Sequence, residues 1–371
     1  MTSLLDLSFE LLESVAFHLN TRECHTAMFT CKTIHQAFSG RPLHHSVIVD
    51  EDDTEDVSKT LQLLYNRLVD KPKVGHWIRI YSLRFVVIEY DNSDFGYEDL
   101  LYDFSLAFLL LRLMPNCHTF EPPRFHSGMS QSFIKARISD ICDMKNLSAF
   151  SFGTETGLHT QFMAPVVGRS SLKTLTLEET DIADLSGMTR PWFNPFLLTL
   201  NLCRCTFGEE DLSRLLVSLP NLQYFSSIEL RSSDLTRIIR TVTRTCPQLQ
   251  VLYIERLLRS RIGTAPGHHV RGEIEPLPND WLASLPFLKC LHLPAQCVNG
   301  MSLQHLPSQV IRVTLAGKGG DAMGIAYAIS KWTRDARIRC RRLVRLSNTL
   351  PEDVQSSIQV SQARSFRPPG L

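Results

Sequence analysis

One short leucine pattern recurs along much of the chain, and it limits the folds that this sequence can adopt. The pattern is L-x-x-L-x-L, with some Phe, Ile and Val substitutions. Clear copies begin at Leu147, Leu172, Leu197, Leu249, Leu288 and Val310, a degenerate copy begins at Leu222, and weaker copies begin at Ile80 and Cys117. The copies are 25 residues apart from 147 to 222, and then 27, 39 and 22 residues apart. Recurrence at such a period predicts a chain of stacked, similar units.

Each copy predicts a short strand, because its last two apolar residues lie two positions apart and point to the same side of a strand. A single strand cannot bury that side alone. We therefore expect the copies to form a parallel sheet whose inner face is covered by the return segments. Residues 210–219 and 233–242 have the apolar spacing of a helix and fit such return segments. The predicted fold class is α/β, with parallel strands covered on one face by helices.

The copy at Leu197 reads LLTLNLCRCTF over residues 197–207, with Cys205 and Phe207 after the strand. This succession resembles the leucine-rich repeat family, in which an Asn or Cys side chain satisfies backbone groups at the turn after the strand. The resemblance implies that role for Cys205. The copy at Leu172 departs from the pattern with Thr180 at the same position. We expect an irregular leucine-rich-repeat solenoid over residues 76–346, with an ordinary α/β domain of leucine-rich strands as the alternative.

Residues 4–40 follow a different pattern, which predicts three short helices. Leu11, Val15, Ala16 and Leu19 share one stripe of the first helix, and Ser8 is a suitable residue to cap it. The second helix is expected at about 22–30 and the third from there to 38. Three helices of this length enclose a very small core, so the segment needs a partner or a neighbouring domain for stability.

The opening of this segment, together with its Thr30-Cys31-Lys32-x-Ile34 element, resembles an F-box. The resemblance implies docking on the Skp adaptor of a cullin–RING ubiquitin ligase. It assigns adaptor binding to Leu7, Ser8, Glu10, Leu11, Leu12, Val15, Leu19, Cys31 and Lys32. Ser8 stands where the family usually has Pro. An F-box followed by leucine-rich repeats is a recurrent domain order, as in fungal F-box proteins. A helical cap for the solenoid is the alternative.

The composition narrows the choice of partners and of compartment. The 371 residues include 39 basic and 38 acidic side chains, and this balance argues against nucleic acid or a membrane surface as the partner. No apolar run is long enough to span a bilayer, and the first residues do not resemble a secretory signal. The ten cysteines show no CxxC and no zinc-finger spacing, which favours the reducing cytoplasm or nucleus and predicts neither disulfides nor a metal.

The remaining segments complete the expected domain organisation. Residues 1–45 form the F-box-like helical domain, 46–75 an acidic linker and first connecting segment, 76–346 the solenoid and 347–371 a C-terminal tail. The run DEDDTED at 50–56 is expected to be a solvated linker. The insertion at 255–280 is expected to be a surface loop. The basic segment at 331–345 is expected to be an exposed, charged face of the last unit, with binding of RNA, a phosphopeptide or an acidic partner as the alternative.

One motif suggests a different kind of function. Gly317 to Ala322 fits G-x-G-x-x-A between an expected strand and an expected helix, which is the local setting of a dinucleotide site. The motif lies close to the end of the chain, and no acidic residue follows at the required distance. We expect no cofactor, with nucleotide binding through Gly317–Ala322 as the alternative. The His pairs at 44–45 and 268–269 lack partners at metal-ligand spacing.

The solenoid predicts where recognition of another protein would occur. In each copy the second, fourth and sixth residues after the first leucine are expected to point outward from the concave face. The candidate target-binding residues at these positions are Thr174, Thr176, Glu178, Thr199, Asn201, Tyr224, Ser226, Tyr253, Glu255 and His292. Tyr224, Tyr253 and His292 come from successive strands and are expected to lie near one another. The function predicted from all of this is a non-catalytic substrate receptor of a Skp–cullin–F-box ligase, with a leucine-rich-repeat scaffold without ligase function as the alternative.

Overall fold

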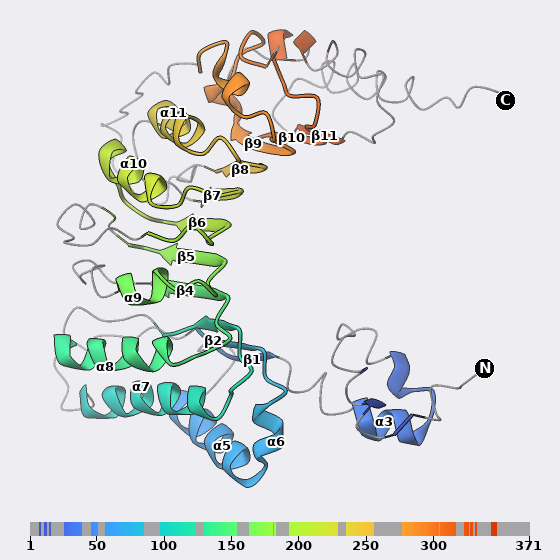
Figure 1. The fold of residues 1–371 in the computed structure, drawn as a ribbon, viewed down its shortest axis with the longest axis vertical. Helices are drawn as coiled ribbons and strands as arrows, with labels where there is room; N and C mark the ends of the chain where they lie inside the picture. The colour runs from blue at the N-terminus through green and yellow to red at the C-terminus, as the bar shows by residue number, and fades with distance from the viewer. Residues whose placement is uncertain are drawn as a thin grey trace, which may run out of the picture. The chain divides into compact units, whose positions relative to one another are not determined.

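The computed structural model divides the chain into two compact units, residues 1–158 and 159–371. The structure describes residues 7–8, 11–12, 15, 26–38, 46–50, 56–84, 97–123, 129–153, 163–180, 182, 193–228, 235–255, 277–303, 305–316, 323–325, 327–328, 331 and 343–346. Most of the described residues in both units belong to a repeating succession of parallel strands and return segments (Figure 1).

Unit 1 begins with the N-terminal helical segment. Leu11, Leu12 and Val15 are helical, residues 26–28 are helical, and α3 spans Lys32–Phe38. Leu12, Ile34 and Ala37 form a buried cluster, and Leu7, Val15, Ala27, Met28 and Cys31 pack against it. These residues therefore share one small core. The bounds of the first two expected helices lie outside the described residues.

The rest of unit 1 alternates strands with helices. The strands β1 (Ser46–Asp50), β2 (Ile80–Arg84), β3 (Thr119–Glu121) and β4 (Ala149–Gly153) pair in chain order and run parallel. The helices between them are α5 (Val57–Asp70), α6 (Pro72–Gly75), α7 (Tyr97–Arg112) and α8 (Gln131–Cys142), and α7 and α8 lie side by side (Figure 1). The segment 46–75, expected to be a linker and first connecting segment, thus provides the first strand and its helices.

The acidic run at 50–56 is structural at both ends. Asp50 is the last residue of β1, and Asp56 caps α5 by accepting a hydrogen bond from the Lys59 backbone N–H at 2.9 Å. A carboxylate at this position also interacts favourably with the positive end of the helix dipole. The two ends of the run thus belong to regular elements and not to a linker, although Asp56 is exposed as expected, and residues 51–55 lie outside the described residues.

The core of unit 1 combines buried leucines with a row of aromatic side chains on its strands. Tyr81, Phe120 and Phe150 occupy the same inward position on β2, β3 and β4. The rings of Tyr81 and Phe120 have centroids 5.7 Å apart, and those of Phe120 and Phe150 are 6.3 Å apart. Phe108 of α7 meets Phe120 edge-on at 5.6 Å. These substitutions explain why the leucine pattern is weak in this half of the chain.

The structure shifts the weak copy that was expected to begin at Ile80. The pairing of Tyr81 with Phe120, together with the complete burial of Ile78, shows that the copy begins at Ile78 and continues through Tyr81 and Leu83. Expecting it at Ile80 was wrong by two residues. The copy at Cys117 is confirmed, because Cys117 is buried and Phe120 pairs with Phe150 of β4.

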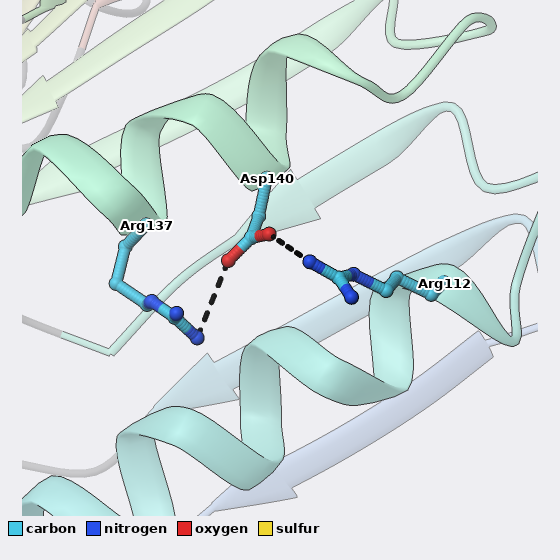
Figure 2. Close-up of polar contacts among 3 residues, drawn as sticks. All are labelled: Arg112, Arg137 and Asp140. Atoms are coloured by element: carbon cyan, nitrogen blue, oxygen red, sulfur yellow. Dashed lines mark hydrogen bonds and ion pairs between the residues drawn. The ribbon is translucent and has the colours of Figure 1, made fainter.

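An ion-pair network joins α7 to α8 (Figure 2). The Arg112 guanidinium of α7 lies 2.9 Å from one carboxylate oxygen of Asp140, and Arg137 of α8 lies 3.2 Å from the other. The Asp140 side chain is only 8% exposed, and the two ion pairs compensate part of the cost of burying its charge. The Arg137 guanidinium also lies over the rings of Phe108 and Phe133, at 5.7 and 5.4 Å from their centroids.

Unit 2 continues the same architecture with a leucine core. Its strands are β5 (Thr174–Glu178), β6 (Thr199–Cys203), β7 (Tyr224–Ile228), β8 (Val251–Ile254), β9 (Cys290–Pro294), β10 (Arg312–Ala316) and β11 (Leu343–Leu346). They pair in chain order and run parallel. The apolar residues that define the copies from Leu172 to Val310 are buried. The expected stacking of these copies is confirmed within unit 2. The last strand, β11, overlaps the end of the segment 331–345, which was expected to be a basic face.

The return segments of unit 2 are only partly helical. Helices α9 (Ala164–Val167), α10 (Glu209–Val217) and α11 (Leu235–Thr245) precede strands, and α10 and α11 lie side by side (Figure 1). The two expected helices correspond to α10 and α11. Between β8 and β10 the described return segments instead contain the short 3-10 helices η5 (Trp281–Ser284) and η6 (Ala295–Cys297). The general expectation of helices therefore does not hold for the described parts of these two connections, while residues 256–276 lie outside the described residues.

Polar side chains hold the turns that follow the strands. The Cys205 thiol is buried and donates to the carbonyl oxygens of Leu177 and Cys203 at 3.3 and 3.5 Å. One repeat earlier, the buried Thr180 hydroxyl donates to the carbonyl of Glu178 at 2.9 Å. Thr180 thus does the work expected of Asn or Cys, and the departure from the pattern at this position is chemically conservative.

Candidate functional site

The sheet face of unit 2 that points away from the core carries all ten candidate target-binding residues. Along each strand these residues are exposed or half-buried, and they alternate with fully buried ones. They are Thr174, Thr176 and Glu178 of β5, Thr199 and Asn201 of β6, Tyr224 and Ser226 of β7, Tyr253 of β8 with Glu255 just after it, and His292 of β9. The parallel pairing brings them together as rows that cross the strands. We call this surface the outer sheet face.

The most ordered cluster on the outer sheet face is aromatic. Tyr253 and His292 are in register on β8 and β9, and their rings stack with centroids 4.0 Å apart and planes 14° from parallel. The Tyr253 hydroxyl donates to a carboxylate oxygen of Glu255 at 2.5 Å. Tyr224 is not part of this stack, because it is in register with Val251 and lies one row away. The expected proximity therefore holds for Tyr253 and His292, while Tyr224 borders them.

Burial sets the protonation of the two stacked rings. Desolvation raises the pKa of Tyr253 to about 12, with the hydrogen bond to Glu255 and its charge acting in the same direction. Desolvation lowers the pKa of His292, and the nearby Glu255 charge opposes this shift. Near neutral pH the phenol is therefore protonated and the imidazole is uncharged. Glu255 is the charged member of the cluster.

The other half of the outer sheet face, on β5 and β6, is lined by small polar groups. Asn201 donates its amide N–H to the Thr176 hydroxyl at 3.1 Å across the two strands. At the turns that follow, Glu179 and Arg204 adopt positive φ angles of 48° and 53°, at equivalent positions of adjacent repeats. Their side chains form an ion pair at 2.6 Å. This pair holds two otherwise unfavourable backbone conformations side by side.

The N-terminal segment places the candidate adaptor-binding residues in two groups. Leu12 is fully buried in the small core, and Leu7, Val15 and Cys31 are partly buried against it. The outward group is Ser8, Lys32 and Leu11, which is 53% exposed. Cys31 also caps α3, because its thiol accepts from the Ile34 backbone N–H at 3.5 Å. Glu10 and Leu19 lie outside the described residues.

Several residues that position these surfaces were missed from the sequence. Phe29 is 88% exposed beside the helical core, and it belongs to no sequence motif that would have marked it. Asn194 is fully buried, donates to the carbonyls of Val167 and Arg169 at 2.6 and 3.0 Å, and accepts from the Phe196 N–H at 2.8 Å. A lone Asn among aromatic residues and prolines gives no signal of this role.

A ladder of asparagines had a usable signal. Asn116, Asn146 and Asn221 each stand one residue before the first apolar residue of a copy. Each donates its side-chain amide to a carbonyl of the preceding repeat, at 3.0, 3.1 and 2.7 Å. The recurrence of Asn just before the apolar residue could have been read from the sequence. These bonds tie neighbouring repeats together along one edge of each unit.

An open groove lies at the amino ends of the unit 2 strands. Its lining includes Lys173, Phe196, Asn221 and Gln223. The Lys173 ammonium lies over the Phe196 ring at 4.9 Å from the centroid. Next to it, Gln223, Gln250 and Lys289 are linked by side-chain hydrogen bonds of 3.0 and 2.9 Å. The groove shows how polar side chains also join adjacent repeats at this edge.

The described part of the chain offers no cluster of three or more His, Cys, Asp or Glu side chains that could hold a metal ion. The eight cysteines among the described residues have free thiols. The Gly317–Ala322 motif, the two His pairs and most of the 255–280 insertion lie outside the described residues. Within the same limits, no helix is long and apolar enough to cross a membrane.

Comparisons with known proteins give only distant likenesses. No family model and no curated protein matches the sequence. The chain is similar to one in the crystal structure of a TLR13–ssRNA13 complex, with 13% identity and a TM-score of 0.40, covering 75% of this chain and 34% of that one. It is also similar to a chain of the yeast Rad7–Elc1 complex, with 10% identity and a TM-score of 0.32, covering 93% and 98%. The chain thus spans about a third of the first of these structures. Similarity this low assigns neither a family nor a function.

Proposed function

We propose that this chain is a non-catalytic substrate receptor of a Skp–cullin–F-box ubiquitin ligase. The N-terminal helical segment would bind the Skp adaptor, and the outer sheet face would bind the target protein. Ubiquitin transfer would be carried out by other subunits, because the receptor needs only to hold target lysines close to the conjugating enzyme. The proposal rests on the two surfaces described above and on the residues that resemble an F-box.

The observation that carries the proposal is the division of the Leu11-Leu12 pair. Leu12 points into the core with Ile34 and Ala37, while Leu11 stays outside and is 53% exposed. Phe29 adds a second exposed apolar side chain to the same segment. A helical module this small gains stability when a partner covers such residues. This arrangement supports a docking surface better than it supports a cap buried against a solenoid.

The outer sheet face supports binding of a protein rather than of a charged polymer. It combines hydroxyl, amide, aromatic and acidic side chains, and it carries no excess of basic residues. Tyrosines are enriched among the residues that dominate binding energy at protein interfaces. We therefore propose recognition without chemistry at this surface.

The experiment that tests adaptor binding is co-expression of the full chain with a Skp adaptor, followed by affinity purification. We expect wild type to retain the adaptor in a one-to-one molar ratio to the chain, and Leu11→Glu and Phe29→Glu each to lose most of the adaptor. Leu63→Glu is the matched control, because Leu63 is a 61% exposed leucine on α5, outside the helical segment. Absence of adaptor from wild type, or equal retention by Leu11→Glu, would refute the proposal.

The second candidate is an interaction scaffold without ligase function. Ser8, where an F-box usually has Pro, is the observation that favours it. Ser8 is exposed, and its carbonyl accepts from the Leu12 N–H at 3.0 Å, so a Pro at this position would leave that helical bond intact. If Ser8→Pro bound the adaptor while wild type did not, the scaffold would be the correct assignment.

A further inference from the structure

The stack on the outer sheet face is one-sided. Tyr253 is in register with His292 on β9, which covers one side of its ring, and with Ser226 on β7. Adjacent strands lie about 4.8 Å apart, which accommodates one flat group per strand in such a row. On β7 the position next to the Tyr253 ring carries only the small side chain of Ser226. On the next strand, β6, the residue in the same row is Asn201, and its side chain donates to Thr176 of β5.

The Glu255 carboxylate lies beside the Tyr253 ring. Glu255 lies two residues beyond Tyr253, and the Tyr253 hydroxyl fixes one of its oxygens at 2.5 Å. Among the described residues no Lys, Arg or His forms an ion pair with Glu255. On the same side of unit 2, by contrast, Glu179 is paired with Arg204 at 2.6 Å. The Glu255 carboxylate therefore has charge and lone pairs available for a partner.

The protonation of the cluster favours a cation. The phenol keeps its proton, because burial and Glu255 raise the pKa of Tyr253 to about 12. The imidazole stays neutral, because burial lowers the pKa of His292. Neither ring therefore opposes a positive charge beside Glu255 near neutral pH. The Tyr253 ring face and the carboxylate attract the same kind of group.

We propose that the target presents an arginine whose guanidinium stacks on Tyr253 above Ser226 and pairs with Glu255. A guanidinium is flat, stacks on aromatic rings and donates to carboxylates through a rigid fork, whereas a lysine ammonium is a strongly hydrated point charge. The inference rests on the proposed function, because it names the chemistry of the target that the outer sheet face would hold. It requires no role of the N-terminal segment.

The test is a titration of the full chain, carrying labelled histidine rings, with N-acetyl-arginine methylamide, followed by NMR. The His292 signal is identified by its absence from His292→Asn. We expect a saturable shift of this signal with millimolar affinity, a weaker response to N-acetyl-lysine methylamide, and none to the neutral citrulline analogue. Glu255→Gln keeps the shape and an acceptor for Tyr253 but removes the charge, and it should weaken arginine binding roughly fivefold. Glu210→Gln, whose side chain is 88% exposed on α10, should leave it unchanged.

Three outcomes would overturn the proposal. The first is a His292 signal that does not respond to the arginine compound up to its solubility limit. The second is an equal response of wild type and Glu255→Gln to arginine, and the third is an equal response of wild type to arginine and to citrulline. Adaptor binding measured on the same protein preparations separates the two proposals. Loss of arginine binding with adaptor binding intact contradicts this inference alone, and the reverse contradicts only the proposed function.

Discussion

Replacing Asn194 with alanine is expected to cost unit 2 a large part of its stability. The side chain is fully buried and makes three short hydrogen bonds, to the carbonyls of Val167 and Arg169 and from the N–H of Phe196, at 2.6, 3.0 and 2.8 Å. A fourth contact, to the Leu172 carbonyl, is 3.5 Å long and adds little.

The expected loss follows from the number of buried groups left without partners. Each net hydrogen bond contributes about 1 kcal/mol, and a buried group left unsatisfied costs about 1–3 kcal/mol. Three bonds therefore give a loss of about 3–5 kcal/mol, against a usual total stability of about 5–15 kcal/mol. Asn194→Asp keeps the volume and the acceptor but points a carboxylate at carbonyl oxygens. It should cost at least as much as Asn194→Ala.

The assay is urea denaturation followed by circular dichroism, with Asn221→Ala as the matched control. Asn221 is exposed and donates one hydrogen bond, to the Pro195 carbonyl at 2.7 Å. Its replacement should cost about 1 kcal/mol or less. If Asn194→Asp remained within about 1 kcal/mol of wild type, the donors of Asn194 would not hold the turn, and the reasoning would be refuted.

Three further predictions concern other parts of the chain. Asp140→Asn should lower the stability of unit 1 by about 1–2 kcal/mol in urea denaturation, and Arg112→Ala by much less because its side chain is 68% exposed; equal effects would contradict this account. Gly75→Ala should lower the midpoint of thermal unfolding, because the added methyl group would overlap the Leu113 carbonyl; an unchanged midpoint would show that the backbone there adjusts freely. Burial lowers the pKa of His292 in the folded chain, so the fold is destabilised as the pH falls below the unfolded pKa of about 6.5 and this histidine must take up a proton. His292→Asn should therefore reduce the loss of unfolding free energy between about pH 7 and 5. An identical dependence of unfolding free energy on pH in wild type and variant would refute this prediction.

The stacked strands of unit 2 could be predicted because their chemistry is periodic. Leu175, Leu200 and Leu252 occupy the same buried position on β5, β6 and β8, so one rule places each strand and both of its faces. The outward positions follow from the same rule, which is why the Tyr253–His292 pair could be anticipated. Its stacking could not, because ring orientation depends on what fills the neighbouring position.

The rest depended on interactions that leave no periodic trace. In unit 1 the rule was hidden by aromatic residues, so Tyr81 was passed over as an inward residue and the copy was placed two residues late. Asn194 acts through backbone carbonyls from distant turns, and a single asparagine does not announce such partners. Leu11 and Leu12 are identical residues in sequence, and only the packing of α3 separates the core residue from the exposed one.

The central claim is that two separate surfaces of one chain serve an adaptor and a target. It is tested most directly by calorimetric titration of the purified full chain with a purified Skp adaptor, for wild type, Leu11→Glu and Glu255→Gln. The account predicts one-to-one binding by wild type, loss of binding in Leu11→Glu, and an unchanged affinity in Glu255→Gln. Absence of heat from wild type, or an affinity that Leu11→Glu leaves intact, would contradict it.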